Sequence, residues 1–444
     1  MHLNSFPLVR LPMPKIEDNR SNGERRCVAA IPFHRPAVGE DEALAAAEAV
    51  RSGWLTTGER TADFERQFAQ FVGADAAVAV SSGTAALHLS LICRGVGGGD
   101  EVLVPATTFT GTAEAVVLTG ARPVLVDIDS ASLNISCVDA QRKITPRTRA
   151  IIAVHVGGMA CAMDEIEALA RRHCLGVVED AAHALPTRYR GRMVGSISEF
   201  TAFSFYATKT LTTGEGGMIT TSDARAAKRL RRLRLHGIER EGARGREQEP
   251  SWKYQVAEAG YKYNLTDFQA AIGLVQLKKC EALRQARERI AARYTQAFAG
   301  LEAIELRGEP AAGGGAGAEE FGFSAESAAK NSQSWHLYIV RIRPGTLEID
   351  REQFIQALEH RGIGASVHFM PLNLHPRYQH EFGYRRGDFP VAEAEYRRSL
   401  SLPIFPDMQD AQIERVIEAV CEIAQGAKVP SKRAAGRAAM SAGR

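Results

Sequence analysis

Cysteine is scarce in this sequence, and a long apolar run is missing. The seven cysteines are scattered, odd in number and never spaced Cys-x-x-Cys, so we expect neither a disulfide framework nor a bound metal ion. No apolar run is long enough to span a bilayer. The first seven residues lack the continuous apolar stretch of a signal peptide. We therefore expect a soluble, cytoplasmic protein that does not act on a membrane.

A strong excess of either charge is also missing. The net charge is +3, from 55 Lys and Arg against 52 Asp and Glu. Five of the basic residues lie after residue 427, where no acid occurs, so residues 427–444 are predicted to form a basic disordered tail. A nucleic-acid partner would need a basic face on a folded domain. The composition indicates none, and the 444-residue length favours two or more ordinary globular domains.

Short apolar runs alternate with helical patterns through the first half of the chain. Residues 1–28 lack periodicity and are predicted to be a disordered extension. Beyond them, alternation of strands and helices predicts an α/β domain over residues 29–265, with a mostly parallel sheet and right-handed crossovers. The predicted strands are residues 78–80, 101–104, 123–127, 150–156, 176–179, 199–205 and 217–221, and the predicted helices are 41–52, 61–71, 110–118, 164–174 and 223–236.

The second half predicts a smaller domain. A long helix over residues 266–300, capped by Thr266, connects it to the first domain. A Gly/Ala-rich segment, residues 308–334, has linker composition and is predicted to be a flexible insert. Strands at 335–340 and 365–369, with helices at 351–361, 391–398 and 411–424, predict an α+β domain over residues 301–426.

Two residues of opposite charge follow neighbouring predicted strands. Asp180 comes directly after the strand at 176–179, and Lys209 lies in a short loop after the strand at 199–205. Open α/β sheets place their ligand sites at the carboxyl ends of parallel strands. A lysine that forms a Schiff base and an acid that keeps a pyridine nitrogen protonated are what pyridoxal phosphate requires. Taken alone, each residue fits an ordinary structural role better, Asp180 as an Asp at a helix entry and Lys209 as a surface Lys before a Gly-rich turn.

Two further segments carry the same ambiguity. The run Ser81-Ser82-Gly83-Thr84-Ala85 follows a strand and opens a helix, so its free N–H groups could bind an anion. For an isolated motif, an ordinary Ser/Thr N-cap is the better explanation. Phe109 lies in a loop at the ligand edge, where its ring could stack on a flat cofactor or simply anchor the loop.

Seven motifs occur together in a fixed order. They are Gly53-Trp54-Leu55-Thr56-Thr57-Gly58, Ser81 to Ala85, Glu179-Asp180-Ala181-Ala182-His183-Ala184, Phe203-Ser204-Phe205-x-x-x-Lys209, Thr213-Gly214-Glu215-Gly216-Gly217, residues 260–267 and residues 401–406. This set resembles the DegT/DnrJ/StrS family of pyridoxal phosphate-dependent nucleotide-sugar aminotransferases, over about residues 31–424. The resemblance implies the aminotransferase fold of type I, with a large cofactor domain and a small C-terminal domain.

The resemblance also implies a role for individual residues. Lys209 matches the Schiff-base lysine, Asp180 the partner of the pyridine nitrogen, and His183 a histidine beside the cofactor ring. The remaining matches are Gly83, Thr84, Ala85 and Ser204 around the phosphate, Phe109 stacked on the ring, Lys262 and Asn264 entering from the partner subunit, and Thr57 and His368 on the substrate side. Many members carry Asn and then Arg where this chain has Lys262 and Asn264, and Pro where it has Glu59.

The implied reaction moves an amino group from L-glutamate to a keto group, most often at C4, of a nucleotide-linked sugar. Products of this kind enter cell-surface polysaccharides or lipid A. Residues 33–36 and 260–267 are similar to those of enzymes that make UDP-4-amino-4-deoxy-L-arabinose. The resemblance implies a homodimer with shared active sites. Amination of a keto-inositol or a C3-keto sugar is an alternative, as is a non-catalytic regulator, against which Lys209 and Asp180 count.

Overall fold

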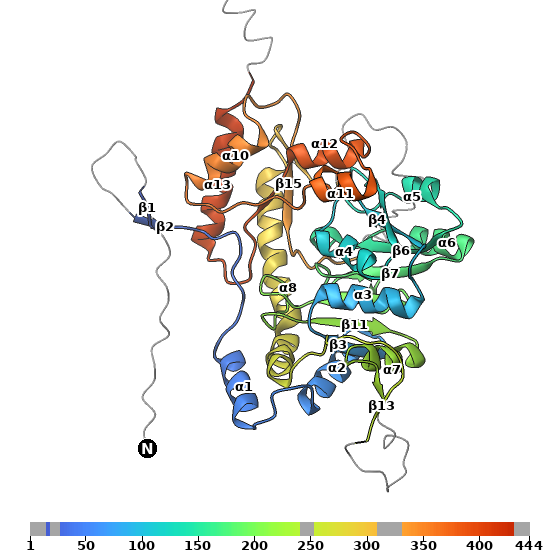
Figure 1. Ribbon diagram of the computed structural model, residues 1–444. Helices are drawn as coiled ribbons and strands as arrows, with labels where there is room; N and C mark the ends of the chain where they lie inside the picture. Colours follow the sequence, from blue (N-terminus) through green and yellow to red (C-terminus); the bar gives the residue numbers. More distant parts are fainter. Residues whose placement is uncertain (1–14, 18–26, 240–252, 309–330, 430–444) are drawn as a thin grey trace, which may run out of the picture.

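A seven-stranded sheet forms the centre of the molecule (Figure 1), and its strand order is β3-β11-β10-β7-β6-β4-β5. The computed structural model describes residues 15–17, 27–239, 253–308 and 331–429. Every strand points the same way except β11, which is antiparallel to both neighbours. The predicted mostly parallel sheet is therefore confirmed. Its strands are β3 (Ala76–Val80), β4 (Glu101–Pro105), β5 (Arg122–Val126), β6 (Thr148–Val154), β7 (Gly176–Asp180), β10 (Phe200–Ser204) and β11 (Gly217–Thr221).

Both faces of this sheet are buried, because successive side chains along a strand point to opposite faces. In β4, Val102 and Val104 join one apolar cluster and Leu103 joins another. The first face is covered by α3 (Gly83–Arg94), α4 (Thr110–Leu118) and α7 (Ala224–Leu233). The second is covered by α2 (Glu59–Val72), α5 (Cys137–Lys143) and α6 (Met163–His173). The result is a three-layered α/β/α domain.

The long helix α8 (Asp267–Phe298) joins the two domains, as the sequence predicts. It begins with a capping box in which the Thr266 hydroxyl accepts from the Gln269 N–H and the Gln269 side chain accepts from the Thr266 N–H. Its first half packs against α1 (Glu40–Arg51) and α2, and its end packs into the core of the small domain (Figure 1). Among the described residues, no helix is both long enough and apolar enough to cross a membrane.

The small domain contains an antiparallel sheet of β14 (Ile304–Leu306), β15 (Tyr338–Ile342) and β16 (Ser399–Leu402). Helices α10 (Arg351–Glu359) and α13 (Asp410–Gly426) contribute to its core. Helices α11 (Pro376–Phe382) and α12 (Pro390–Arg398) instead bury Tyr378 and Ala392 in the core of the large sheet, together with Phe389, the N-cap residue of α12. The two domains thus share apolar packing along their boundary.

Short elements complete the described fold. Two short helical turns, η1 (Val156–Gly158) and η3 (Leu372–Leu374), lie beside the site described below. Two small hairpins are formed by β8 (Arg188–Tyr189) with β9 (Arg192–Met193) and by β12 (Ile238–Glu239) with β13 (Gln255–Val256).

The structure corrects the predicted strand over residues 365–369. Only Ser366 pairs there, through two backbone hydrogen bonds with Ser401 of β16. Residues 365–369 are all half-buried, and Ala365 packs against the core of the small domain without being buried in it, so the segment lacks the fully buried face that stabilises a strand. The predicted strand at 335–340 also begins later, at Tyr338.

The ends of the chain differ from the predicted boundaries. Residues 15–17 form strand β1 (Lys15–Glu17), which pairs with strand β2 (Cys27–Ala29) at the boundary between the predicted extension and the large domain. Residues 427–429 bond to residues 346–348 through backbone groups, so the predicted tail begins in contact with the small domain. Within the predicted insert 308–334, residues 331–334 are described and Ser334 is fully buried. The remaining parts of the predicted extension, insert and tail lie outside the described residues.

Candidate active site

The two central residues of the predicted site come from neighbouring parallel strands. Asp180 is the last residue of β7, and it is the register partner of Ala202 in β10. Lys209 lies in the turn after β10, where its backbone N–H donates to the Tyr206 carbonyl at 2.9 Å. Because parallel strands end at the same edge of a sheet, the fold brings both side chains to one place.

Asp180 is a buried acid with an incomplete set of partners. It is 6% exposed. The Thr112 hydroxyl donates to its Oδ2 at 2.8 Å and the Ala182 N–H donates to its Oδ1 at 3.1 Å. Burial raises the pKa of Asp180, while these two hydrogen bonds and the charge of Lys209 oppose the rise. No cation of the described residues forms an ion pair with it, so a positively charged ligand atom could balance the charge of this carboxylate.

Lys209 is a half-buried amine whose basicity is reduced. Burial lowers its pKa from 10.5 to about 8, and the negative charge of Asp180 opposes that shift. A considerable fraction of Lys209 is therefore neutral near physiological pH. A neutral amine is the form that attacks a carbonyl carbon and accepts a proton.

The start of α3 forms a cradle next to these residues. Ser82 is the N-cap, and its hydroxyl accepts from the Ala85 N–H at 3.1 Å. A Cβ at Gly83 would lie 2.9 Å from the Cβ of Ser204, so a glycine is needed where the helix passes the end of β10. Thr84 follows in the first turn. The positive end of a 12-residue helix with unbonded N–H groups suits a phosphate.

Aromatic side chains stand on the open side of the cradle. Phe109 is the N-cap residue of α4 and is 60% exposed, with its ring centroid 6.0 Å from that of Phe369. The His183 ring stacks on Phe369 at 5.9 Å and lies 4.3 Å from the His336 ring. Phe109 therefore does not anchor a core. It presents an exposed flat face beside the site.

The protonation of His183 is set by its neighbours. Its Nδ1 accepts from the Gly157 N–H at 3.2 Å, which leaves any proton on Nε2. Burial lowers the pKa of His183 well below its usual value, and the charge of Lys209 lowers it further. His183 is thus a neutral ring held in one orientation.

The predicted residues at the mouth of the site lie together at the edge strand β3. The Asn264 amide donates to the Thr57 hydroxyl at 2.8 Å, and Thr57 in turn donates to the Leu265 carbonyl. Asn264 also bridges to Val80 at the end of β3. Lys262 is exposed. Within one chain, Thr57 and Asn264 therefore bond to each other rather than projecting separately.

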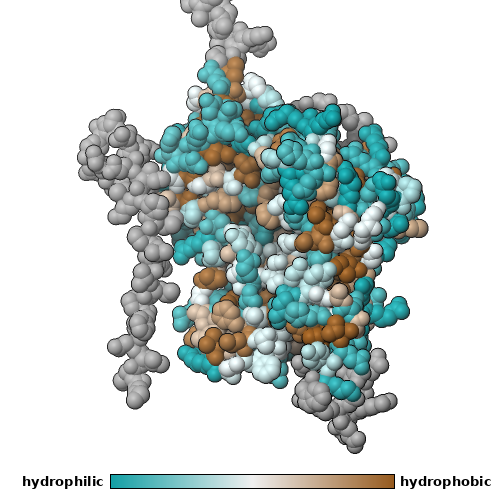
Figure 2. Space-filling view, viewed as in Figure 1, coloured by the Kyte–Doolittle hydropathy of each residue, from teal (hydrophilic) through white to brown (hydrophobic). Residues whose placement is uncertain are grey.

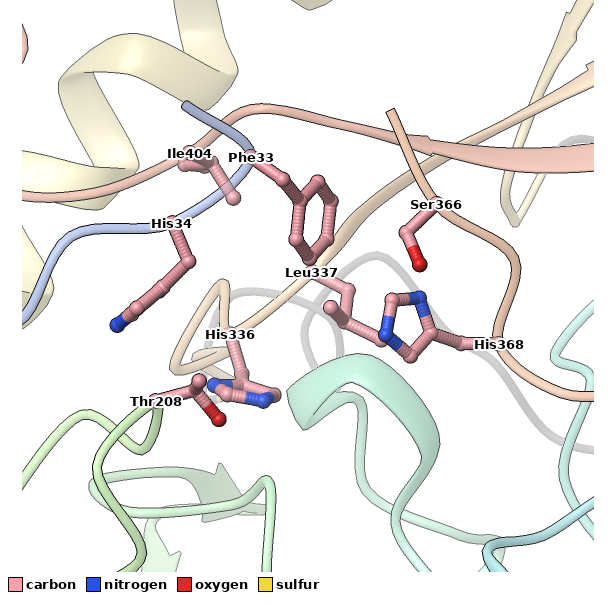
Figure 3. A pocket seen from close by; sticks show the side chains of 8 residues that line it. All are labelled: Phe33, His34, Thr208, His336, Leu337, Ser366, His368 and Ile404. Carbon is pink, nitrogen blue, oxygen red and sulfur yellow. The ribbon is translucent and has the colours of Figure 1, made fainter. Parts of the chain in front are cut away.

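A cavity of about 220 Å³ is lined by Thr208, the neighbour of Lys209, and by the predicted residue His368 (Figure 3). Its lining also includes residues that sequence reasoning did not assign to the site, notably His34 and His336. Both lie in motifs visible in the sequence, the start at residues 33–36 and the strand entry at residues 335–337. No local pattern signals that these two segments meet.

Long-range backbone pairing explains the position of His34. The Ile31 N–H donates to the Gly362 carbonyl at 2.8 Å, and the Gly364 N–H donates to the Ile31 carbonyl at 2.9 Å. The Phe33 ring then stacks on His368 at 5.4 Å. Thr112, the donor to Asp180, is another residue that sequence reasoning missed, because nothing in its helix marks it as distinct.

The site combines a lysine and a buried acid at one edge of a mostly parallel sheet with a helix start suited to phosphate and an exposed aromatic ring. This combination fits the class of enzymes that bind pyridoxal phosphate. The start of α3 suits the phosphate, Asp180 has no cation paired with it among the described residues, and Lys209 has a lowered pKa.

Comparison with known proteins gives the family. The model of the DegT/DnrJ/EryC1/StrS aminotransferase family matches residues 36–421. The spore coat polysaccharide biosynthesis protein SpsC of Bacillus subtilis is 44% identical over 398 residues, which cover 89% of this chain and 98% of SpsC.

Two solved structures are also similar to this chain over most of its length. Spr1654 of Streptococcus pneumoniae in its pyridoxal phosphate form has a TM-score of 0.79 at 32% identity, covering 89% of this chain and 99% of that one. DesV of S. venezuelae has a TM-score of 0.76 at 35% identity, covering 88% and 95%. The chain belongs to this family of sugar aminotransferases: it has the aminotransferase fold of type I and is a pyridoxal phosphate-dependent aminotransferase.

Proposed function

We propose that the enzyme transfers the amino group of L-glutamate to a keto group, at C4, of a nucleotide-linked sugar used for a cell-surface polysaccharide. One observation carries the proposal: Asp180 and Lys209 meet at the sheet edge below α3 in a chain of the sugar aminotransferase family. The relative SpsC, which is named for spore coat polysaccharide biosynthesis, supports the product class.

The cofactor supplies an aldehyde that bonds covalently to amines and a ring that withdraws the electron pair left on the reacting carbon. In this assignment Lys209 would hold the cofactor through Nζ. Once freed by an amino substrate, Nζ would take a proton from one carbon and return it to another. The pKa of about 8 suits both steps, because the amine is neither fully charged nor very weakly basic near neutral pH.

Asp180 would hold positive charge on the ring nitrogen through its carboxylate. The hydrogen bonds from Thr112 and Ala182 fix its two oxygens in place and favour the ionised form. His183 and Phe109 would orient the ring, since His183 is fixed by Gly157 and Phe109 presents an exposed face. Gly83, Thr84, Ala85 and Ser204 would bind the phosphate, with Thr57 and His368 on the substrate side.

A homodimer with shared sites belongs to the proposal. Five large apolar side chains between residues 38 and 55 are about half exposed: Val38, Leu44, Val50, Trp54 and Leu55. Apolar colour gathers on the surface at the position of α1 (Figure 2). Such a patch is typical of a surface that another protein covers. The exposed Lys262 and its neighbour Asn264 would reach the partner's phosphate. Analytical ultracentrifugation tests this, and a stable monomer would contradict it.

The function is tested by incubating the purified, cofactor-loaded enzyme with L-glutamate and a panel of nucleotide-linked keto sugars. We expect 2-oxoglutarate and an amino sugar in equal amounts, and mass spectrometry of the product would locate the amino group. The Lys209→Ala variant is the matched control and should form neither. Transfer to keto-inositols alone, or from glutamine alone, would refute the sugar or the donor respectively.

A further inference from the structure

Ser334 is a buried serine that lies 151 residues from His183 in the chain and in contact with it in the structure. It is 0% exposed, and its hydroxyl donates to the His183 carbonyl. Its N–H donates to the Thr187 hydroxyl at 3.1 Å, and Thr187 donates in turn to the Gly158 carbonyl at 2.9 Å. Both donor groups of Ser334 therefore bond to the segment that follows Asp180.

Gly158 leaves the space that Ser334 occupies. Its φ of +97° lies in a region that side chains rarely adopt. A Cβ at this position would lie 2.0 Å from the Ser334 Oγ and 3.0 Å from the His183 carbonyl oxygen. Only glycine therefore lets the serine hydroxyl reach that carbonyl, so the bond between them is part of a closely packed contact and not a loose surface bond.

The residues that follow the serine hold His183 at two further points. The His336 ring lies 4.3 Å from the His183 ring. The Leu337 N–H donates to the Gly157 carbonyl at 3.2 Å, and the Gly157 N–H donates to the His183 Nδ1 at 3.2 Å. The segment thus fixes the backbone of His183 directly, contacts its ring, and holds the residue that selects its tautomer. A group held from several sides in this way keeps one geometry.

These contacts are not part of the small-domain sheet. The pairing of β15 with β16 begins at Tyr338, so residues 334–337 lie outside that ladder. Just before them, Ser332 exchanges two backbone hydrogen bonds with Arg188 of β8, at 3.0 and 3.1 Å. The segment therefore lies against the large domain and leads directly into β15, the central strand of the small sheet. It connects that strand to the histidine beside the cofactor site.

We propose that Ser334 is a positioning residue for the cofactor, acting through His183. Its hydroxyl fixes the backbone of His183, so that the imidazole beside the cofactor ring keeps one orientation. Ser334 does not act on the reacting atoms, because its hydroxyl is bonded to the His183 carbonyl. The inference rests on the role proposed above for His183 and adds a residue that lies outside all seven sequence motifs.

The test measures how the cofactor is held and not turnover. Bound cofactor has a visible circular dichroism band only because its surroundings are fixed and asymmetric. The affinity for pyridoxamine 5′-phosphate reports contacts other than a covalent bond to Lys209. Ser334→Ala removes the donor to the His183 carbonyl, so we expect a smaller band per bound cofactor and roughly twofold to tenfold weaker binding of pyridoxamine 5′-phosphate. A band and an affinity equal to those of the wild type would overturn the proposal.

Ser90→Ala is the matched control, because Ser90 is also 0% exposed and its hydroxyl donates to the Ala86 carbonyl at 2.8 Å within α3. It should leave the band and the affinity unchanged, and a change as large as that of Ser334→Ala would count against the proposal. Thr187→Val removes the acceptor of the Ser334 N–H and leaves the serine hydroxyl in place, so it should shift both measurements in the same direction and by less. It decides the question if Ser334→Ala does not fold, and values equal to those of the wild type would overturn the proposal.

A second comparison separates this role from a purely structural one. In a His183→Ala background, Ser334→Ala should cause no further loss of band or affinity, because the serine acts through the imidazole. Equal losses in both backgrounds would overturn the proposal. Failure of the proposed function gives a different pattern. An enzyme that aminates none of the keto sugars but loses the band in Ser334→Ala retains this inference, whereas normal transfer with an unchanged band refutes only this inference.

Discussion

Thr112→Val tests whether Asp180 works as an ionised group. The substitution keeps the shape of the side chain and removes one of the two hydrogen bonds that Asp180 accepts, the 2.8 Å bond to Oδ2. A hydrogen bond to a charged group is worth about 1.5–3 kcal/mol. At about 1.4 kcal/mol per pKa unit, its loss should raise the pKa of the already raised Asp180 by roughly 1–2 units.

The direction in which the pH profile of activity shifts follows from the negative charge that Asp180 must carry. Activity that needs the carboxylate is lost as the pH falls through the pKa of Asp180, so a higher pKa moves the acid limb of the kcat/KM profile to higher pH. We expect Thr112→Val to shift that limb upward by about 1–2 pH units and to approach wild-type activity in alkaline buffer. Thr108→Val is the control, because Thr108 bonds to the Thr112 hydroxyl at 2.7 Å, one step further from Asp180. Superimposable profiles for Thr112→Val and wild type would refute the reasoning.

Three further predictions concern the cofactor and the fold. The neutral amine of Lys209 is the form that reacts, so the rate of cofactor uptake by cofactor-free enzyme should rise with pH up to about 8 and then level off. Stopped-flow absorbance measures this rate, and a rate that does not change with pH would contradict the prediction. Gly83→Ala should weaken cofactor affinity at least about tenfold through its contact with Ser204, whereas Gly97→Ala, which meets nothing within 4 Å, should not, as fluorescence titration would reveal. Asp267→Ala removes an acceptor for three backbone N–H groups in the loop before α2 and in the first turn of that helix. Thermal scans should therefore show a Tm lower by at least about 2 °C. An unchanged Tm would argue against a stabilising role for these hydrogen bonds.

The elements of the large domain could be predicted because their signals are local. Most strands of the sheet are short, largely apolar runs buried on both faces, and the helices between them carry one apolar stripe. Asp180 and Lys209 could be placed at one edge without further information, since parallel strands align their carboxyl ends. Their chemistry could be suggested from residue types alone, whereas the family resemblance was needed to choose it over ordinary structural roles.

The cavity could not be predicted, because it is built from segments far apart in the chain. His34 reaches it only through the pairing of Ile31 with Gly362 and Gly364. His336 precedes β15, whereas the sequence suggests that it belongs to the strand. The prediction of a strand that contains His368 is wrong for a related reason. Residues near a site are held by contacts on several sides and not by the regular hydrogen bonds of a paired strand. Local periodicity carries no information about such contacts.

The distribution of charge explains why so many imidazoles surround one lysine. His34, His183, His336 and His368 all have pKa values lowered by burial and by nearby cations, so they add hydrogen-bonding groups without adding charge. The charge beside these rings therefore rests on Lys209 and on the buried acid Asp180, each of which shifts the pKa of the other. Replacing any of these histidines by lysine or arginine would add a buried cation and should impair folding, whereas a neutral polar replacement would preserve the balance of charge.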